Sequence, residues 1–74
     1  MDILKIFGGN VRKYRTALGK SQEKLAEDCG LHRTYISDIE RSQRSISLNN
    51  VQKIADALSI EVHKLFIKGD TENK

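Results

Sequence analysis

The chain has 74 residues, 38% of them apolar, and carries 13 basic against 10 acidic side chains for a net charge of +3. A chain of this length buries only a thin core, which excludes most classes of enzyme. The longest apolar run, Leu65-Phe66-Ile67, is too short to span a membrane, and the single cysteine, Cys29, cannot form an internal disulfide. We therefore expect one cytoplasmic domain over residues 1–68 and a disordered tail over residues 69–74.

The positive charge is concentrated in the first two thirds of the chain. Residues 1–47 hold nine basic and six acidic side chains, whereas residues 48–74 hold four of each. The stretch from Ile3 to Gln22 contains five basic residues and no acid. Such a bias is typical of a surface that faces a polyanion such as nucleic acid, and a solvated basic face is the alternative.

Apolar residues recur at helical spacing, and the first predicted helix covers residues 2–18, with Asp2 as N-cap and Gly19 as its stop. Its apolar face would consist of Ile3, Phe7, Val11, Tyr14 and Leu18. Two consecutive glycines at positions 8 and 9 oppose a continuous helix, because each costs roughly 1 kcal/mol relative to alanine. A helix that starts at Val11 is the alternative, and we favour the continuous one.

Four shorter helices are predicted after this one. Ser21 caps a second helix that ends at Gly30, and a third is expected over residues 33–41. Ser47 caps a fourth helix, whose shared face would be Leu48, Val51, Ile54, Ala55 and Leu58. A short fifth helix would carry Val62, Leu65 and Phe66. No stretch alternates with a period of two, so the predicted fold class is all-α, a compact five-helix domain.

The segment from Gln22 to Arg41 has the pattern of two short helices joined by a tight turn. Ala26 lies where the two helices would cross most closely, and Gly30 lies at the turn, where a left-handed backbone costs glycine nothing. The inner faces would be supplied by Leu25, Cys29, Leu31, Ile36 and Ile39. This is the helix-turn-helix arrangement, which holds its second helix at the surface so that it can enter a DNA major groove.

The sequence SQEKLAEDCGLHRTYISDIER, followed by a polar loop and ISLNNVQKIADALSIEVHKLF, resembles the phage-repressor-like (Cro/cI, XRE) helix-turn-helix family. The resemblance extends from Ile3 to Phe66. Within it, RTYISDIERSQRSISLNN is similar to the controller proteins of restriction-modification systems. The resemblance implies a lambda-repressor-like DNA-binding domain with its helix-turn-helix at the second and third helices.

The third helix would carry the base-reading residues, because Ile36 and Ile39 face inward. Thr34, Ser37 and Asp38 would face outward, and Arg33 would lie on the flank at the exposed first turn. Arg33 is the first choice, since a guanidinium donates a bidentate pair to guanine worth roughly 1 to 3 kcal/mol of discrimination; a phosphate contact is its alternative. Asp38 would be tolerated near phosphates only if it accepted a hydrogen bond from cytosine or paired with an arginine.

The predicted phosphate contacts flank this helix. Gln22 lies at the first turn of the second helix, where the resemblance implies that its side chain and the neighbouring backbone N–H groups clamp a phosphate, a task that suits a helix N-terminus. The resemblance implies that Tyr35 contacts the DNA backbone, and that Arg44 contacts the backbone or reaches further into a groove. Arg41 is a predicted phosphate contact because it flanks the same loop. A half-buried core tyrosine and solvated loop arginines are the alternatives. Arg15 and Glu40 match a pair that forms a partly buried salt bridge in phage repressors, which gives these two residues a structural role.

No catalytic, metal or cofactor site is expected. His32 and His63 are far apart in sequence and have no cluster of ligands beside them. Histidine also caps poorly, so His32 leaves the start of the third helix uncertain by one residue. Cys29 is expected to be a small buried apolar residue.

The end of the chain is the predicted dimer interface. One reading helix specifies only a few base pairs, so a regulator needs two copies to find its site. The apolar residues there are Ile60, Val62, Leu65 and Phe66, more than a short helix can bury alone. Closure of the core of a single chain by these residues is the alternative.

These patterns favour a sequence-specific, dimeric DNA-binding transcriptional regulator rather than an enzyme. The resemblance implies a controller protein that binds a pseudo-palindromic operator in double-stranded DNA, acts on its own promoter and on the endonuclease gene, and is compatible with a contact to RNA polymerase. The alternatives are a phage-type repressor or an antitoxin of the same fold, and a helical protein-interaction module that does not bind DNA.

Overall fold

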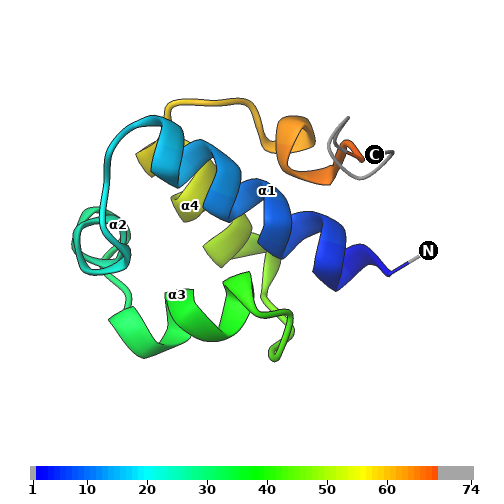
Figure 1. The fold of residues 1–74 in the computed structure, drawn as a ribbon, viewed down its shortest axis with the longest axis horizontal. Coiled ribbons are helices and arrows are strands. Elements are labelled where there is room, and N and C mark those ends of the chain that lie inside the picture. Colours follow the sequence, from blue (N-terminus) through cyan, green and yellow to red (C-terminus); the bar gives the residue numbers. More distant parts are fainter. Residues whose placement is uncertain (1, 69–74) are drawn as a thin grey trace.

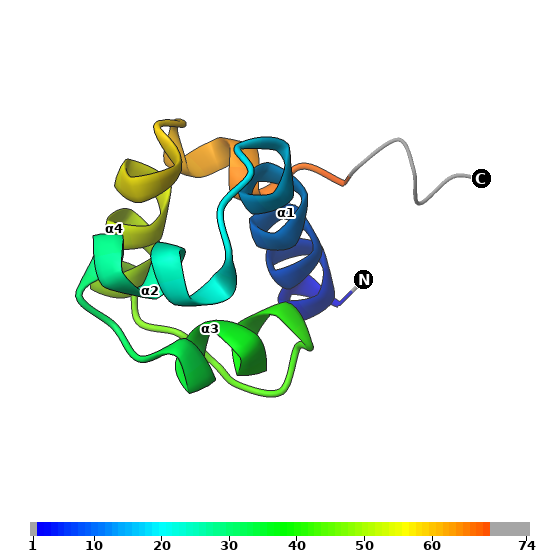
Figure 2. The ribbon, with the colours of Figure 1, turned by 60° about the vertical axis from the view of Figure 1, so that its left-hand side comes forward.

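The structure, a computed structural model, describes residues 2–68. These residues form the α-helices α1 (Ile3–Ala17), α2 (Gln22–Cys29), α3 (Arg33–Glu40) and α4 (Leu48–Leu58), then the 3₁₀ helix η1 (Val62–Phe66), and contain no strand. The predicted all-α class is confirmed, with the last element a 3₁₀ rather than an α-helix. The helices enclose one core, with α3 along one edge of the molecule and η1 along another (Figures 1 and 2). The predicted tail over residues 69–74 lies outside the described residues.

Short polar side chains begin three of the four α-helices, as predicted. The Asp2 carboxylate accepts hydrogen bonds from the backbone N–H groups of Leu4 and Lys5. Ser21 and Ser47 accept the corresponding bonds at the starts of α2 and α4. His32 precedes α3 without any side-chain capping bond, and α3 nevertheless starts at Arg33. The poor cap at His32 therefore does not move the start of α3 from its predicted position.

Helix α1 runs without a break through its two glycines, and Gly8 has a packing reason to be there. A methyl group at Gly8 would overlap the backbone carbonyl oxygen of Ile39, whereas a methyl group at Gly9 would point into open space. The absence of a side chain at Gly8 thus lets α1 lie directly against the backbone of α3. The loss of helix propensity at this position is offset by the close packing that it permits.

The buried face of α1 is shorter along the helix than predicted. Ile3 and Leu18 are about half exposed, at 47% and 51%, because the two ends of α1 extend past the core. The buried residues of the helix are Ile6, Phe7, Gly8, Asn10 and Val11.

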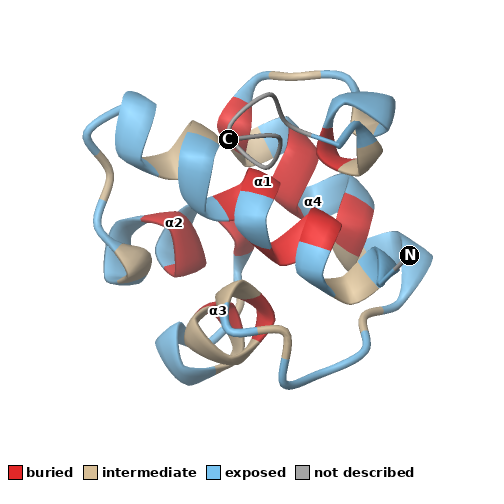
Figure 3. Cartoon of the chain, turned by 45° about the vertical axis from the view of Figure 1, so that its right-hand side comes forward, coloured by how far each residue is buried: buried red, intermediate tan, exposed pale blue. Residues whose placement is uncertain are grey.

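In α4 the core-facing stripe begins at Val51. Leu48 is 84% exposed, so its predicted place on that face is wrong. Leu48 lies in the first turn, before α4 enters the core, and Figure 3 shows the buried residues gathered where α1 and α4 meet.

A buried asparagine attaches η1 to α1. Asn10 is only 4% exposed, and its side-chain amide donates to the carbonyl oxygens of Leu65, at 2.9 Å, and Ile67, at 2.8 Å. Phe66 packs against Phe7, with a ring-centroid distance of 5.2 Å. These contacts satisfy carbonyl groups at the end of η1 that have no partner within the helix.

Candidate nucleic-acid interface

Helices α2 and α3 are joined by the tight turn that the sequence predicted. Gly30 ends α2 in the left-handed conformation, with φ 71° and ψ 31°, and the N–H of Leu31 donates to the carbonyl of Ala26 at 2.9 Å. Ala26 is 3% exposed, as a close crossing requires. Four of the five predicted inner residues belong to the buried core, and Leu31 packs against it half-buried. The helix-turn-helix geometry is therefore present, with α3 at the surface.

An ion pair connects α1 with the end of α3. The Arg15 guanidinium donates to both Glu40 oxygens, from Nε at 2.6 Å and from Nη2 at 3.0 Å. The two side chains are 12% and 4% exposed, so the pair is largely shielded from water. The hydrogen bond to Glu40 raises the pKa of Arg15 above its usual range. The structure thus brings together the two residues for which the resemblance implied a structural role.

Gln22 is part of the same network. Its side-chain amide donates to Glu40 Oε1 at 3.1 Å, and the residue is half-buried. The side chain of Gln22 therefore lies against a buried carboxylate rather than extending into solvent. Its backbone N–H remains at the N-terminus of α2, where a phosphate would be favoured.

The outward face of α3 presents the four predicted base-reading residues. Arg33 and Thr34 are exposed, whereas Ser37 and Asp38 are half-buried. Asp38 Oδ1 accepts a hydrogen bond from Arg41 Nη2 at 2.8 Å, so its charge is compensated by a neighbour on the same surface. Among the described residues, Arg33 has no salt-bridge partner, and its guanidinium donors remain available to a ligand.

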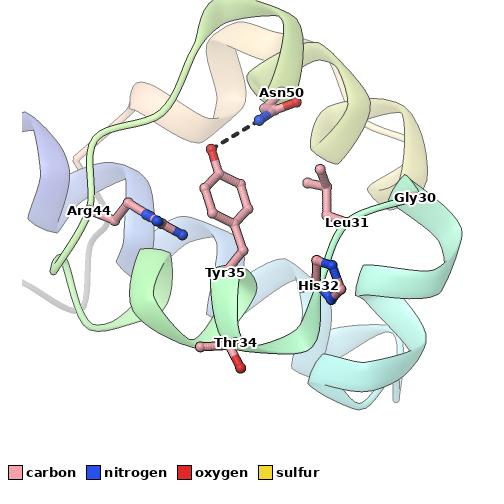
Figure 4. A pocket seen from close by; sticks show the side chains of 7 residues that line it. All are labelled: Gly30, Leu31, His32, Thr34, Tyr35, Arg44 and Asn50. Carbon is pink, nitrogen blue, oxygen red and sulfur yellow. Dashed lines mark hydrogen bonds between the residues drawn. The ribbon is translucent and has the colours of Figure 1, made fainter.

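A groove of about 420 Å³ lies between α3 and the start of α4 (Figure 4). At its centre the Tyr35 hydroxyl accepts a hydrogen bond from Asn50 Nδ2 at 3.0 Å. The guanidinium of Arg44 stands 5.0 Å from the centre of the Tyr35 ring, in cation–π contact. The lining residues are Gly30, Leu31, His32, Thr34, Tyr35, Arg44 and Asn50. Because Thr34 belongs to both, the groove adjoins the outward face of α3.

Not all of the basic residues in the first part of the chain face outward. Lys20 donates to Asp28 Oδ2 and to the carbonyl of Ala57, both at 2.8 Å, and so ties the α1–α2 loop to α2 and α4. Its hydrogen bond lowers the pKa of Asp28 below the ordinary value. With Arg15 also engaged internally, the excess of positive charge between Ile3 and Gln22 does not form a single ligand-facing surface. Exposed arginines without a salt-bridge partner among the described residues are Arg12 on α1, Arg33 on α3 and Arg44 in the loop after α3.

The cysteine and the two histidines do not belong to a cluster of metal ligands within the described residues. Cys29 is buried, and burial raises the pKa of its thiol to about 11, so it is a neutral thiol at physiological pH. His32 and His63 are exposed, and the described residues contain no group of three or more side chains that could hold a metal ion. No helix in this part of the chain is long and apolar enough to cross a membrane.

The four predicted interface residues fall into two groups. Ile60, Val62 and Phe66 are half-buried and retain exposed surface, next to Ile67, which is 52% exposed. Leu65 is completely buried in the core of the single chain, so its predicted place in a dimer interface is wrong. Leu65 packs into the core, while its neighbours Lys64 and Phe66 retain exposed surface.

Two asparagines with evident roles were not predicted. Asn10 gave one sequence signal, a polar residue on the apolar face of α1 one turn after Phe7. For Asn50 the only sequence signal was its position one turn after the cap of α4. Its contact could not be predicted because its partner, Tyr35, is 15 residues away in the chain. Neither long-range contact can be deduced from local periodicity.

Comparison with known proteins identifies the family. The helix-turn-helix model HTH_3 matches residues 11–65. Control protein C.BamHI from Bacillus amyloliquefaciens is 52% identical over 61 residues, which cover 81% of this chain and 75% of that protein. The restriction-modification controller protein C.AhdI from Aeromonas hydrophila has a TM-score of 0.83 at 51% identity, over 85% of this chain and 96% of that one. SinR, solved in complex with DNA, has a TM-score of 0.79 at 32% identity, over 82% of this chain and 98% of that one. The chain therefore belongs to the helix-turn-helix family, and within that family it is similar to restriction-modification controller proteins.

Proposed function

We propose that this chain is a DNA-binding transcriptional regulator that acts as the controller protein of a restriction-modification system. The observation that carries the proposal is the helix-turn-helix itself, with α3 supported from behind by Gly8 and by the Arg15–Glu40 pair, and with Arg33 exposed at its first turn. The similarity to C.BamHI and C.AhdI supports the controller role, and the similarity to SinR, which is solved with DNA, supports the ligand.

Base reading is assigned to the exposed start of α3. Arg33 has free guanidinium donors and would donate a bidentate pair to guanine O6 and N7. Thr34 would contact a thymine methyl group or a base acceptor, and Ser37 would reach a base edge or a phosphate. Asp38 lies on this face and is paired with Arg41, so its repulsion of the DNA backbone is reduced. Asp38 could read a base directly only if this ion pair were broken.

Contacts to the DNA backbone are assigned to residues on either side of the reading helix. Arg41 and Arg44 supply positive charge, and Tyr35 supplies a hydroxyl within the groove. Gln22 would use its backbone N–H at the start of α2, because its side chain is hydrogen-bonded to Glu40. Such contacts fix the orientation of the protein on the duplex without reading its sequence.

The regulator would bind as a homodimer through η1 together with Ile60, two residues before it, and Ile67, the residue after it. Ile60, Val62 and Phe66 leave apolar surface exposed there, continuous with Ile67. Figures 1 and 2 show η1 on a different edge from α3, so both surfaces can be occupied at once. Two α3 helices about one DNA turn apart would read a pseudo-palindromic operator. The same proposal includes control of its own promoter and of the endonuclease gene. The regulator would act in the cytoplasm and would contact RNA polymerase.

Fluorescence anisotropy with a labelled duplex of random sequence tests whether the chain binds DNA. About six phosphate contacts predict that the logarithm of affinity falls with the logarithm of salt concentration with a slope of roughly −5. Selection of bound duplexes from a random pool should then yield a two-fold symmetric sequence. The absence of any salt-dependent binding would contradict the proposal and favour a protein-interaction module instead.

A further inference from the structure

Asn50 is the only described residue whose side chain forms a hydrogen bond with the Tyr35 hydroxyl. The amide nitrogen of Asn50, in the first turn of α4, donates to the hydroxyl oxygen at 3.0 Å, and both residues are half-buried. This bond links α4 to α3 between two side chains that line the groove, as Figure 4 shows. None of the roles assigned above involves Asn50.

The direction of this hydrogen bond determines what the hydroxyl can do next. A phenol has one proton to donate and two lone pairs that accept. Because the Asn50 amide donates, the hydroxyl oxygen is the acceptor and its own proton remains free for another partner. A bond accepted by the oxygen also polarises the O–H group and strengthens the bond that it donates. A phosphate oxygen, which only accepts, is the partner that such a hydroxyl suits.

The position of the hydroxyl agrees with a ligand of that kind. The groove that contains it is also lined by Thr34, from the outward face of α3, and by Arg44, whose guanidinium lies over the Tyr35 ring. A neutral donor and a cation thus lie beside the surface that would face a duplex. The described residues offer no acidic side chain in the lining of this groove.

We propose that Asn50 is a positioning residue that holds the Tyr35 hydroxyl as a hydrogen-bond donor to one DNA backbone phosphate. This inference rests on the proposed function. Asn50 acts through Tyr35, so removal of either side chain removes the same bond to DNA. Because the hydroxyl is neutral, the loss should be equal for all sequences and should leave the salt dependence unchanged.

The test measures the affinity of the full chain for a random duplex and for a duplex selected from a pool. Asn50→Ala and Tyr35→Phe should each weaken binding to both duplexes by about 5- to 10-fold, with an unchanged salt slope. In the Tyr35→Phe background, Asn50→Ala should cause no further loss, as expected for two residues that act as one unit. Asn50→Asp should weaken binding by about 100-fold, because its carboxylate would accept the hydroxyl proton and repel the phosphate. It also serves as the second variant if Asn50→Ala does not fold.

Asn49 supplies the matched control, since it is exposed in the same turn of α4 and is not among the groove-lining residues. Asn49→Ala should bind both duplexes within about twofold of the unmodified chain. Unchanged affinity of Asn50→Ala, or losses that multiply in the double variant, would overturn the role of Asn50. If the unmodified chain bound neither duplex, the proposed function would fail first, so the two failures are distinguishable.

Discussion

Gly8 of α1 lies directly against the backbone carbonyl of Ile39 in α3, with no room for a methyl group between them. Ile39 is buried on the inner face of the helix that carries Arg33 and Thr34. The depth at which α3 packs on the core is therefore set by a contact between two backbones. This contact, with the Arg15–Glu40 pair beside it, holds the proposed reading helix from the side opposite to DNA.

Gly8→Ala should destabilise the fold by about 2 to 3 kcal/mol, because the added methyl group forces α1 and α3 apart. Gly9→Ala is the matched control, since a methyl group there meets nothing within 4 Å. It should stabilise the fold by about 0.5 to 1 kcal/mol through helix propensity alone. Urea unfolding of both variants measures the difference, and equal stabilities would contradict the close approach of the two helices.

Arg15→Ala should destabilise the fold by about 3 kcal/mol, because it would leave the Glu40 carboxylate, at 4% exposure, without its cationic partner. The double variant Arg15→Leu with Glu40→Leu should recover most of that loss, since it leaves neither charge behind. Thermal and urea unfolding give both values. Similar stability of Arg15→Ala and the unmodified chain would show that Glu40 does not depend on this arginine.

The helices, their caps and the turn at Gly30 were predictable because each depends on residues close together in the chain. Ser21 and Ser47 bond to N–H groups three residues away, and Gly30 ends α2 by its own conformation. The roles of Gly8, Asn10 and Asn50 were not predictable in this way, since their partners are 15 to 57 residues distant or lie on another helix. Leu48 and Leu65 fit the same apolar periodicity, yet one is exposed and the other fully buried. Periodicity assigns a residue to a face, and only the packing of the helices decides how deep that face lies.

Stability in acid should depend on Asp28. The hydrogen bond from Lys20 lowers the pKa of Asp28 below its ordinary value of 3.8. The stabilisation is therefore fully present above about pH 4 and is lost as the pH falls through the lower value of the folded state. Asp28→Asn should be less stable than the unmodified chain at neutral pH, and the two stabilities should converge as the pH falls below the folded-state pKa of Asp28. Urea unfolding across this range checks it, and a difference that persisted at the lowest pH would contradict this origin.

Substitutions in η1 should separate effects on the stability of the single chain from effects on dimer formation. Leu65→Ala should lower the free energy of unfolding by about 2 to 5 kcal/mol, because this side chain is fully buried in the single chain. Val62→Asp should leave the chain folded, since Val62 is half-buried at the surface, and should dissociate the proposed dimer. Sedimentation at tens of micromolar tests this prediction. Unmodified chain that sedimented only as a monomer would remove the basis for a two-fold operator.

The most direct test of the central claim compares Arg33→Ala with the unmodified chain on a selected duplex and on a random duplex of equal length. The unmodified chain should prefer the selected duplex by about 10³-fold or more. Arg33→Ala should lose about 10- to 100-fold of that preference while its binding to the random duplex falls only slightly. If Arg33→Ala retained the full preference, with its fold intact, α3 would not read DNA through Arg33 and the assignment of the reading face would be wrong.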